Sequence, residues 1–361
     1  MHDDTMLLKI AVGRDKAEKR AYANDRAGRR AMLAELRRRS LVAGGARVVL
    51  AYEASGQGFG LHDEVKAAGF DCHVLAPTKI ARSPRHRKSK CDEHDAERLL
   101  ELVRGHVLAG NDLPSVWVPD PETRDDREIV RGRLDVAEKL TALKSQIRML
   151  LKRSSATKPE GFGKKWTNAY RAWLRGLTRS GSVLGYGARM SLGSLLRQME
   201  SLEEEVLLLD DQIEALSGSM RYAEPAREMM REKGVGILTA MVFLTEMGAL
   251  SRFGNHKQVG SYLGLVPSSD ETGEGTERKG HITHQGPWRV RKALCQATWT
   301  RVRTDPQEKA AYQRVAAKNP KHKKIAVVAS MRRLGIRLWH IGLEAQRRSQ
   351  RITDRAVSAV A

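Results

Sequence analysis

Short apolar runs separated by polar turns make up the first third of the chain. Runs at residues 7–12, 47–52 and 72–75 predict three strands, and amphipathic spacing over 24–39 and 62–68 predicts a helix between each pair. Strands that alternate with helices at this spacing indicate an α/β layer with some parallel pairing.

The middle of the chain has a different pattern, with apolar residues at alternating spacings of four and three. Pro119 and Pro121 end the α/β section, a long helix begins at Glu122, and the same spacing returns over 192–216. This repeat is typical of a coiled-coil seam. Spacing alone does not fix the partner, so the seam can join two chains or close an antiparallel hairpin within one chain.

A glycine turn opens the last third, where Gly234 and Gly236 precede an apolar helix at 237–247. A turn of this kind can present backbone N–H groups to a phosphate, as in a helix-hairpin-helix module. It can equally be no more than a tight turn between two helices.

A polar, glycine-rich segment over 262–291 follows, which we expect to be a loop between two helices. Loops of this length are usually functional or disordered. Its hydroxyl groups on Ser268, Ser269 and Thr272 are candidate nucleophiles. A basic helical arm, 318–337, comes after it and suits contact with a phosphate backbone.

The net charge limits the classes of molecule that the chain can be expected to bind. The chain has 64 lysine and arginine residues and 43 acidic ones, for a formal net charge of +21. A basic excess of this size indicates a polyanion, with nucleic acid as the first candidate. No apolar run approaches the ~18 residues of a spanning helix and no signal peptide is recognisable, so we expect a cytoplasmic protein without a membrane partner. Three cysteines without CxxC spacing predict reduced thiols and no structural metal.

Carboxylates give the chain its candidate metal chemistry. Asp92 and Asp95 fall on one face of a helix that starts there, and two such oxygen ligands suit Mg²⁺. Glu53 stands at the carboxyl end of a predicted strand, where α/β sheets gather their sites. The alternatives are a helix cap for the aspartates and a solvated strand end for the glutamate.

These residues together resemble a known family. Y-E-A-S-G at 52–56 and K-C-D-E-H-D-A at 90–96 are similar to two acidic motifs of the DEDD insertion-sequence transposases, the bridge-RNA-guided recombinases. G-V-G at 234–236 with Glu246, Y-L-G-L-V-P at 262–267, and G-H-I-T at 280–283 with Gly286 resemble the family's C-terminal domain. The order and spacing of these motifs cover most of the chain.

The resemblance implies a fold of α/β plus all-α type. It comprises a RuvC-like, ribonuclease-H-type domain over 1–120, a helical coiled-coil region over 121–218, a mainly helical transposase domain with a helix-hairpin-helix over 219–345, and a basic flexible tail over 346–361. It further implies Mg²⁺ held by four acids, a serine that attacks a DNA phosphate, and a structured guide RNA. Coiled-coil pairing fits a homo-oligomer, either a dimer or a tetramer, that holds two duplexes at once.

Two positions depart from the family pattern. The first aspartate of the family falls at Gly13 in this register, which leaves Asp15, or less favourably Asp4, as the fourth acid, unless a true first strand is missing from the chain. The serine that precedes a glycine in the family is Thr272 here, with Ser269 as the fallback. Threonine can act as a nucleophile, although its β-branch restricts χ1.

Three hypotheses follow from these residues. The leading one is a DNA transposase with Thr272 as nucleophile and Glu53, Asp92, Asp95 and Asp15 as catalytic metal ligands. The others are a decayed member that only binds nucleic acid, and a metal-dependent junction nuclease that uses water. The residues expected to contact nucleic acid are Lys90, Gly234, Gly236, Arg278, Lys279, His281, Arg289, Lys321, Lys323 and Lys324.

Overall fold

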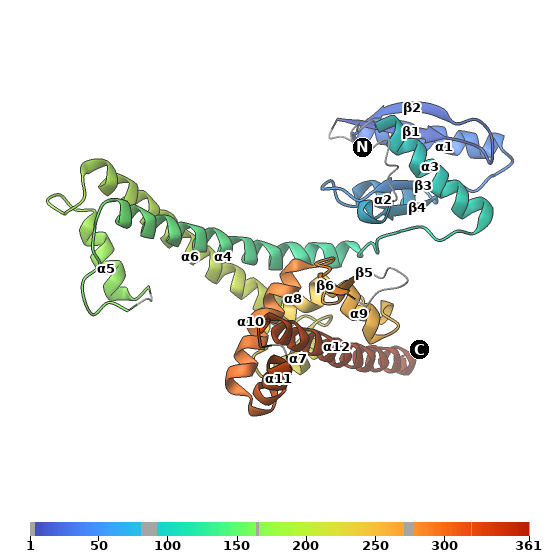
Figure 1. Ribbon diagram of the computed structural model, residues 1–361. Helices are drawn as coiled ribbons and strands as arrows, with labels where there is room; N and C mark the ends of the chain where they lie inside the picture. The colour runs from blue at the N-terminus through green and yellow to red at the C-terminus, as the bar shows by residue number, and fades with distance from the viewer. Residues whose placement is uncertain (1–3, 81–91, 164–165, 271–277, 319, 361) are drawn as a thin grey trace. The chain divides into compact units, whose positions relative to one another are not determined.

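The computed structural model describes residues 4–80, 92–163, 166–270, 278–318 and 320–360. The chain divides into two compact units, Met1–Val118 and Pro119–Ala361 (Figure 1). None of the helices in the described part of the chain combines the length and the apolar composition that crossing a bilayer requires.

Unit 1 is a mixed α/β structure. Its strands pair as two short sheets, with β1 antiparallel to β2 and β3 parallel to β4, so the predicted parallel pairing is present. A ribonuclease-H-type domain implies one continuous sheet, whereas the described strands form two. Its elements are β1 (Thr5–Ile10), β2 (Glu18–Ala23), α1 (Arg26–Val42), β3 (Val49–Glu53), α2 (Gly60–Ala67), β4 (Asp71–Leu75), η1 (Pro77–Lys79) and α3 (Asp92–Ala109).

Different helices cover the two faces of these strands. Met6 of β1 and Tyr52 of β3 are buried in one apolar cluster with Met32 of α1, while no residue of α3 belongs to that cluster among the described residues. Side chains alternate along a strand, so Lys9 and Glu53 belong to the opposite face. α3 contacts both β1 and β3, and it therefore covers the face that carries these two charges.

β2 has no counterpart among the strands that the apolar pattern predicts. It reads EKRAYA, and of its six residues only Tyr22 packs on the core. A strand with mostly exposed side chains shows no hydrophobic alternation, so periodicity does not reveal it.

Unit 2 is almost entirely helical, with one short β-hairpin. Its elements are α4 (Pro121–Arg153), α5 (Asn168–Leu177), α6 (Tyr186–Ser217), α7 (Ala223–Met230), α8 (Ile237–Met247), η3 (Leu250–Arg252), α9 (His256–Tyr262), β5 (Pro267–Asp270), β6 (Arg278–Ile282), α10 (Trp288–Thr304), α11 (Pro306–Lys318) and α12 (Lys324–Val360).

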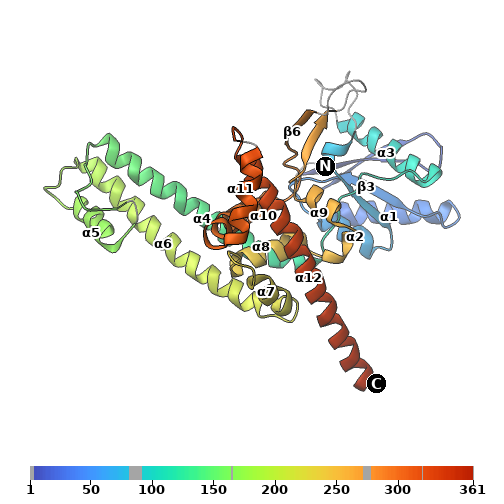
Figure 2. The ribbon, with the colours of Figure 1, turned by 60° about the horizontal axis from the view of Figure 1, so that its bottom comes forward.

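The heptad-like segments of α4 and α6 pack against each other within one chain, side by side in both views (Figures 1 and 2). Ile147 of α4 and Leu192 and Met199 of α6 are fully or almost fully buried between them. This is the intrachain hairpin, one of the two arrangements that fit the sequence spacing. The bidentate pair of Arg133 with Asp210 links the two helices at their flank.

α8 forms the centre of unit 2. Residues 240–247 are all buried. α8 contacts α4, α6, α7 and α10, and it shares one apolar cluster with residues of α12. A helix that is apolar all round belongs in a core, and this one is enclosed on every side by amphipathic neighbours.

Two expectations about the last third need correction. The segment over 262–291 is not one loop, because β5 and β6 pair antiparallel within it. The strands are short and polar, so they lack the alternation of apolar and polar residues that predicts a strand. The expected flexible tail over 346–361 continues α12 as far as Val360, and α12 itself is a core helix that buries Leu338 and Trp339.

Candidate active site

The face of unit 1 beneath α3 brings together charges from two strands. Lys9 is the single charged residue of β1, and its side chain is only 11% exposed. Glu53 is half-buried and ends β3, in register with Leu75 of β4. The strand register thus places a cation and a carboxylate on the α3 side of the two sheets.

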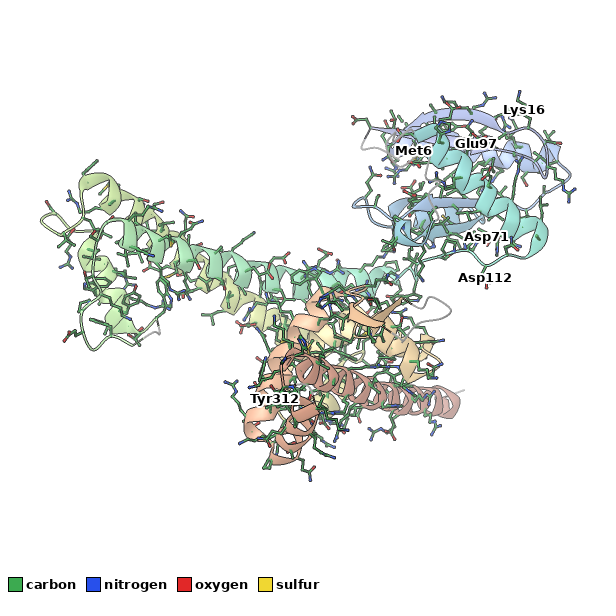
Figure 3. All side chains as sticks on the ribbon, viewed as in Figure 1. Met6, Lys16, Asp71, Glu97, Asp112 and Tyr312 are labelled. Atoms are coloured by element: carbon green, nitrogen blue, oxygen red, sulfur yellow. The ribbon has the colours of Figure 1, made fainter. Side chains whose placement is uncertain are left out.

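Three acidic residues, Asp92, Glu93 and Asp95, lie in the first turn of α3. The Lys9 ammonium lies 2.9 Å from one carboxylate oxygen of Glu93, and the Lys19 ammonium lies 2.7 Å from the other. Hydrogen bonds from Lys19 and Lys9 lower the pKa of the Glu93 carboxylate to about 2. Glu93 therefore bridges the β1–β2 hairpin to the start of α3. Figure 3 labels Glu97, one turn further along this helix, which also acts electrostatically on Lys9.

The two predicted ligands on α3 have different surroundings. Asp95 is half-buried and lies 3.6 Å from Arg98 one turn later, a helical pair of modest strength. Asp92 is exposed at the first position of the helix. Both the metal-ligand and the helix-cap interpretations place acidic residues in this turn.

Asp15 lies at the opposite end of α3. Its backbone carbonyl accepts a hydrogen bond from Arg104, eleven residues beyond Glu93. A helix rises 1.5 Å per residue, so these two positions are about 16 Å apart along α3. Asp15 as a ligand shared with Asp92 and Asp95 stays a prediction.

Gly13, two residues before Asp15, lies in the turn after β1 at a positive φ of 51°. A Cβ there would meet nothing within 4 Å. The residue of β1 that faces the acidic turn of α3 is Lys9, four positions earlier.

The described side chains hold no preformed cluster of metal ligands. Among the described residues, no three His, Cys, Asp or Glu side chains are grouped closely enough to hold a metal ion. Glu53, Asp92 and Asp95 share a face of unit 1, and Lys9 of β1 lies on the same face, paired with Glu93. The predicted Mg²⁺ site stays a prediction.

Comparison with known proteins assigns both halves of the chain. A model of the DEDD transposase domain of the IS110 type matches residues 10–155, and a model described as the IS116/IS110/IS902 transposase family matches residues 226–313. The chain belongs to the IS110 family of transposases. Glu53, Asp92 and Asp95 all fall within the first match, and DEDD domains of this kind generally use divalent metal ions.

Several relatives carry transposase names. The protein y4qE of Sinorhizobium fredii is 30% identical over 258 residues, which are 70% of this chain and 58% of y4qE. From the same organism, y4rJ is 28% identical over 308 residues, 81% of this chain and 76% of y4rJ. The transposase for insertion sequence element IS1533 of Leptospira borgpetersenii is 28% identical over 200 residues, 54% of each chain. The chain thus spans little more than half of two of these relatives.

The glycine turn before α8 in this IS110-family chain has a packing explanation. Gly234 has a φ of 80°, and a Cβ there would come within 2.8 Å of the Ala297 carbonyl oxygen on α10. Gly234 is therefore needed for close approach of the backbone. Gly236 caps α8 with open space around it, so phosphate binding at that end of α8 stays a prediction.

The two strands of the β5–β6 hairpin lie on either side of the predicted nucleophile in sequence. Thr272 lies outside the described residues, between the two strands in sequence. The Ser268 hydroxyl donates a hydrogen bond to the His281 carbonyl across the hairpin. Arg278 and Lys279 belong to β6, and Ser269 to β5, while Lys90 lies outside the described residues.

The basic residues that are predicted to contact nucleic acid differ in whether they form ion pairs within the protein. Arg289 pairs with Asp135 at 2.9 Å and lies over the Trp288 ring, so it is already committed to α4. Lys321, Lys323 and Lys324 are exposed at the start of α12, and no described carboxylate pairs with any of them. Of these four, the lysines are the ones positioned for an external partner.

Lys9 is the residue that motif matching misses. The local sequence does single out Lys9, because it is the one charged residue in the otherwise mostly apolar strand TMLLKI. Its partner Glu93 is 84 residues away, and no local pattern reports that contact.

Proposed function

We propose that this protein is the transposase of an insertion sequence, which binds DNA at the element ends and target and cuts and joins its strands. The observation that carries the proposal is the match of both family models, in order, to 10–155 and 226–313. The net charge of +21 supports a nucleic-acid partner. A guide RNA belongs to the proposal by family resemblance, and a homo-oligomer, dimer or tetramer, because two duplexes must be held at once.

Contact with the DNA backbone is assigned to the start of α12. Lys321, Lys323 and Lys324 gather there, and the positive end of the helix dipole adds to the attraction for phosphate. Contacts of this type fix position and do not read sequence.

Replacing these three lysines together with alanine should weaken binding to any duplex. Each lost phosphate contact reduces the slope of log K against log salt by about 0.9, so the triple variant should lose up to about 2.7. Arg175, Arg227 and Arg231 form a matched control, because each is exposed but paired with a glutamate on unit 2. The assignment fails if removing these three arginines changes the slope as much.

The chemistry proposed is transfer of a phosphodiester to a protein hydroxyl. The Thr272 oxygen bonds to phosphorus, the bond to one deoxyribose oxygen breaks, and the hydroxyl proton passes to that leaving oxygen. The phosphodiester is conserved in the adduct, so the reverse step can join a new strand end. Basic side chains hold the strands, and fixed positive charge stabilises the transition state.

A suicide DNA substrate, nicked so that the leaving strand diffuses away, tests this chemistry. The native chain should accumulate a covalent adduct that denaturing electrophoresis retains, Thr272→Ala should not, and Thr272→Ser should. Nicking without an adduct supports the junction nuclease that uses water.

Binding without nicking supports the decayed member. The departures from the family pattern at the first aspartate and at Thr272 are the features that favour this alternative.

A further inference from the structure

We propose that the far end of the α4–α6 hairpin is a second DNA-binding surface, which holds a duplex by its phosphate backbone. This end, the hairpin tip, comprises residues 140–203 and includes α5, which lies away from α8 in both views (Figures 1 and 2). Most of the tip lies in the stretch 156–225, which neither family model matches. The inference goes beyond the proposed function by adding a surface, and it rests on that function in taking the polyanion to be DNA.

Charge is divided unevenly along the hairpin. The tip contains twelve lysine and arginine residues and three acidic ones. The base of the hairpin, residues 121–139 and 204–217, contains five basic residues and eleven acidic ones. A polyanion is therefore attracted to the tip and repelled by the base, which confines it to one end of the hairpin.

The tip has an apolar core of its own. Ile147 of α4, Leu174 of α5 and Leu192 of α6 are fully buried in one cluster, which is separate from the cluster around α8. Arg131 of α4 pairs with α8, and Arg148 lies 17 residues further along the same helix. That interval is about 26 Å of helix, so the tip projects well beyond the core of unit 2.

Ion pairs within the tip engage only some of its cations. Glu203 accepts hydrogen bonds from Lys144 at 2.9 Å and from Arg171 at 2.8 Å, and Glu200 accepts one from Arg175 at 2.6 Å. The exposed cations of the tip that pair with no described carboxylate are Arg148, Lys152, Arg153, Arg179 and Arg197.

The helix dipole explains two of these unpaired cations. Lys152 and Arg153 lie in the last turn of α4, where the dipole favours positive charge. Arg148 lies a full turn earlier, and Arg179 and Arg197 belong to other segments. The cations therefore form a surface that capping of α4 alone does not account for.

The aromatic side chains of the tip favour a duplex over a single strand. The rings of Tyr170 and Trp173 stack with centroids 5.5 Å apart, and Trp166 meets Tyr170 edge-on at 5.3 Å. Among the described rings of the tip, Tyr186 is the only exposed one. Single strands are held largely by bases that stack on aromatic side chains, whereas a duplex can be held by phosphate contacts alone. The tip offers mainly the second kind of contact.

The proposed function supplies a reason for a second surface. A transposase that joins an element end to a target must hold two duplexes, and the lysines at the start of α12 account for one of them. The tip supplies backbone contacts for the other, which fix its position without reading its sequence.

Fluorescence anisotropy of the full chain with a random-sequence DNA duplex, between 50 and 200 mM salt, tests the proposal. All chains carry Lys321→Ala, Lys323→Ala and Lys324→Ala, so that α12 does not mask the tip. Adding Arg148→Gln, Lys152→Gln and Arg153→Gln should reduce the slope of log K against log salt by up to about 2.7. The chain with an intact tip should therefore lose up to about 40-fold more affinity over this range than the tip variant.

A matched control removes the same charge elsewhere in unit 2. Lys139→Gln, Arg227→Gln and Arg231→Gln neutralise three exposed cations outside the tip and should leave the slope unchanged. If the tip variant does not fold by circular dichroism, Arg179→Gln with Arg197→Gln replaces it, with an expected reduction of up to about 1.8.

Photo-cross-linking locates the duplex directly. A benzoylphenylalanine in place of Thr157, which is exposed in the tip, should cross-link to the DNA. The same group in place of Gln212, which is exposed in the acidic base, should not.

The proposal is overturned by equal slopes in the tip variant and the control, or by cross-linking at Gln212 without cross-linking at Thr157. It is also overturned if the tip variant loses binding to duplex RNA only, or if it loses self-association in sedimentation while its DNA slope is unchanged. Binding is measured here without strand joining. A chain that binds DNA through its tip but never joins strands contradicts the proposed function alone, and a chain that joins strands with a tip variant that binds normally contradicts this inference alone.

Discussion

Arg127→Met is expected to lower the free energy of unfolding of unit 2 by about 3 kcal/mol, because it uncovers buried carbonyl groups at the end of α8. Arg127 is 8% exposed, and its guanidinium donates hydrogen bonds to the carbonyls of Thr245 at 2.6 Å and Glu246 at 3.0 Å. Burial lowers the pKa of Arg127, which shows that the charge is held at a desolvation cost. α8 has no basic residue in its own last turn, so Arg127 supplies the cation that the helix dipole favours there.

Guanidinium unfolding followed by far-ultraviolet circular dichroism measures this effect. Arg133→Met is the matched control, since Arg133 lies on the same helix but pairs with the half-exposed Asp210. A pair of this kind contributes about 1 kcal/mol or less. Equal losses in the two variants would show that the buried carbonyls at the end of α8 do not need Arg127.

Gly286→Ala is expected to destabilise unit 2 by about 2 to 5 kcal/mol, the sum of a left-handed backbone penalty and overpacking. Gly286 has a φ of 87°, and a Cβ there would fall 1.8 Å from the Tyr262 carbonyl oxygen. Gly264 meets the backbone of Gln285 in the same way, at 2.1 Å. The turn after α9 and the turn before α10 therefore touch backbone to backbone, and Arg291 donates to carbonyls of both.

This contact holds the two ends of the segment that carries Thr272. Thermal unfolding by circular dichroism should show a lower melting temperature for Gly286→Ala, together with loss of any DNA adduct. Gly132→Ala is the control with the opposite sign, because Gly132 lies inside α4 with open space around it, and alanine there should add about 0.5 to 1 kcal/mol. A Gly286→Ala chain as stable as the native one would mean that the two turns can separate without cost.

The sequence predicts those elements that have a local pattern of apolar residues. β3, α2 and β4 follow from apolar runs broken by glycine and proline, and the heptad spacing of α4 and α6 gave the seam that the hairpin buries. Strands with exposed or polar side chains, β2, β5 and β6, carry no such pattern, so the apolar periodicity does not predict them.

Contacts between residues far apart in sequence cannot be predicted from local patterns, for a different reason. Arg127 meets α8 across 118 residues, and Lys9 meets Glu93 across 84. Each partner looks like an ordinary exposed charge until the fold joins them. The same limit explains Asp15, which is near Gly13 in sequence but beside Arg104 in the structure.

A recombination assay in cells tests the central claim most directly. The native chain is supplied with the DNA that flanks its gene, beside Thr272→Ala and Thr272→Ser variants. The account predicts joined DNA from the native chain and from Thr272→Ser, and none from Thr272→Ala. Undiminished joining by Thr272→Ala would contradict the hydroxyl mechanism, and a native chain that binds this DNA but never joins it would contradict the assignment as a working transposase.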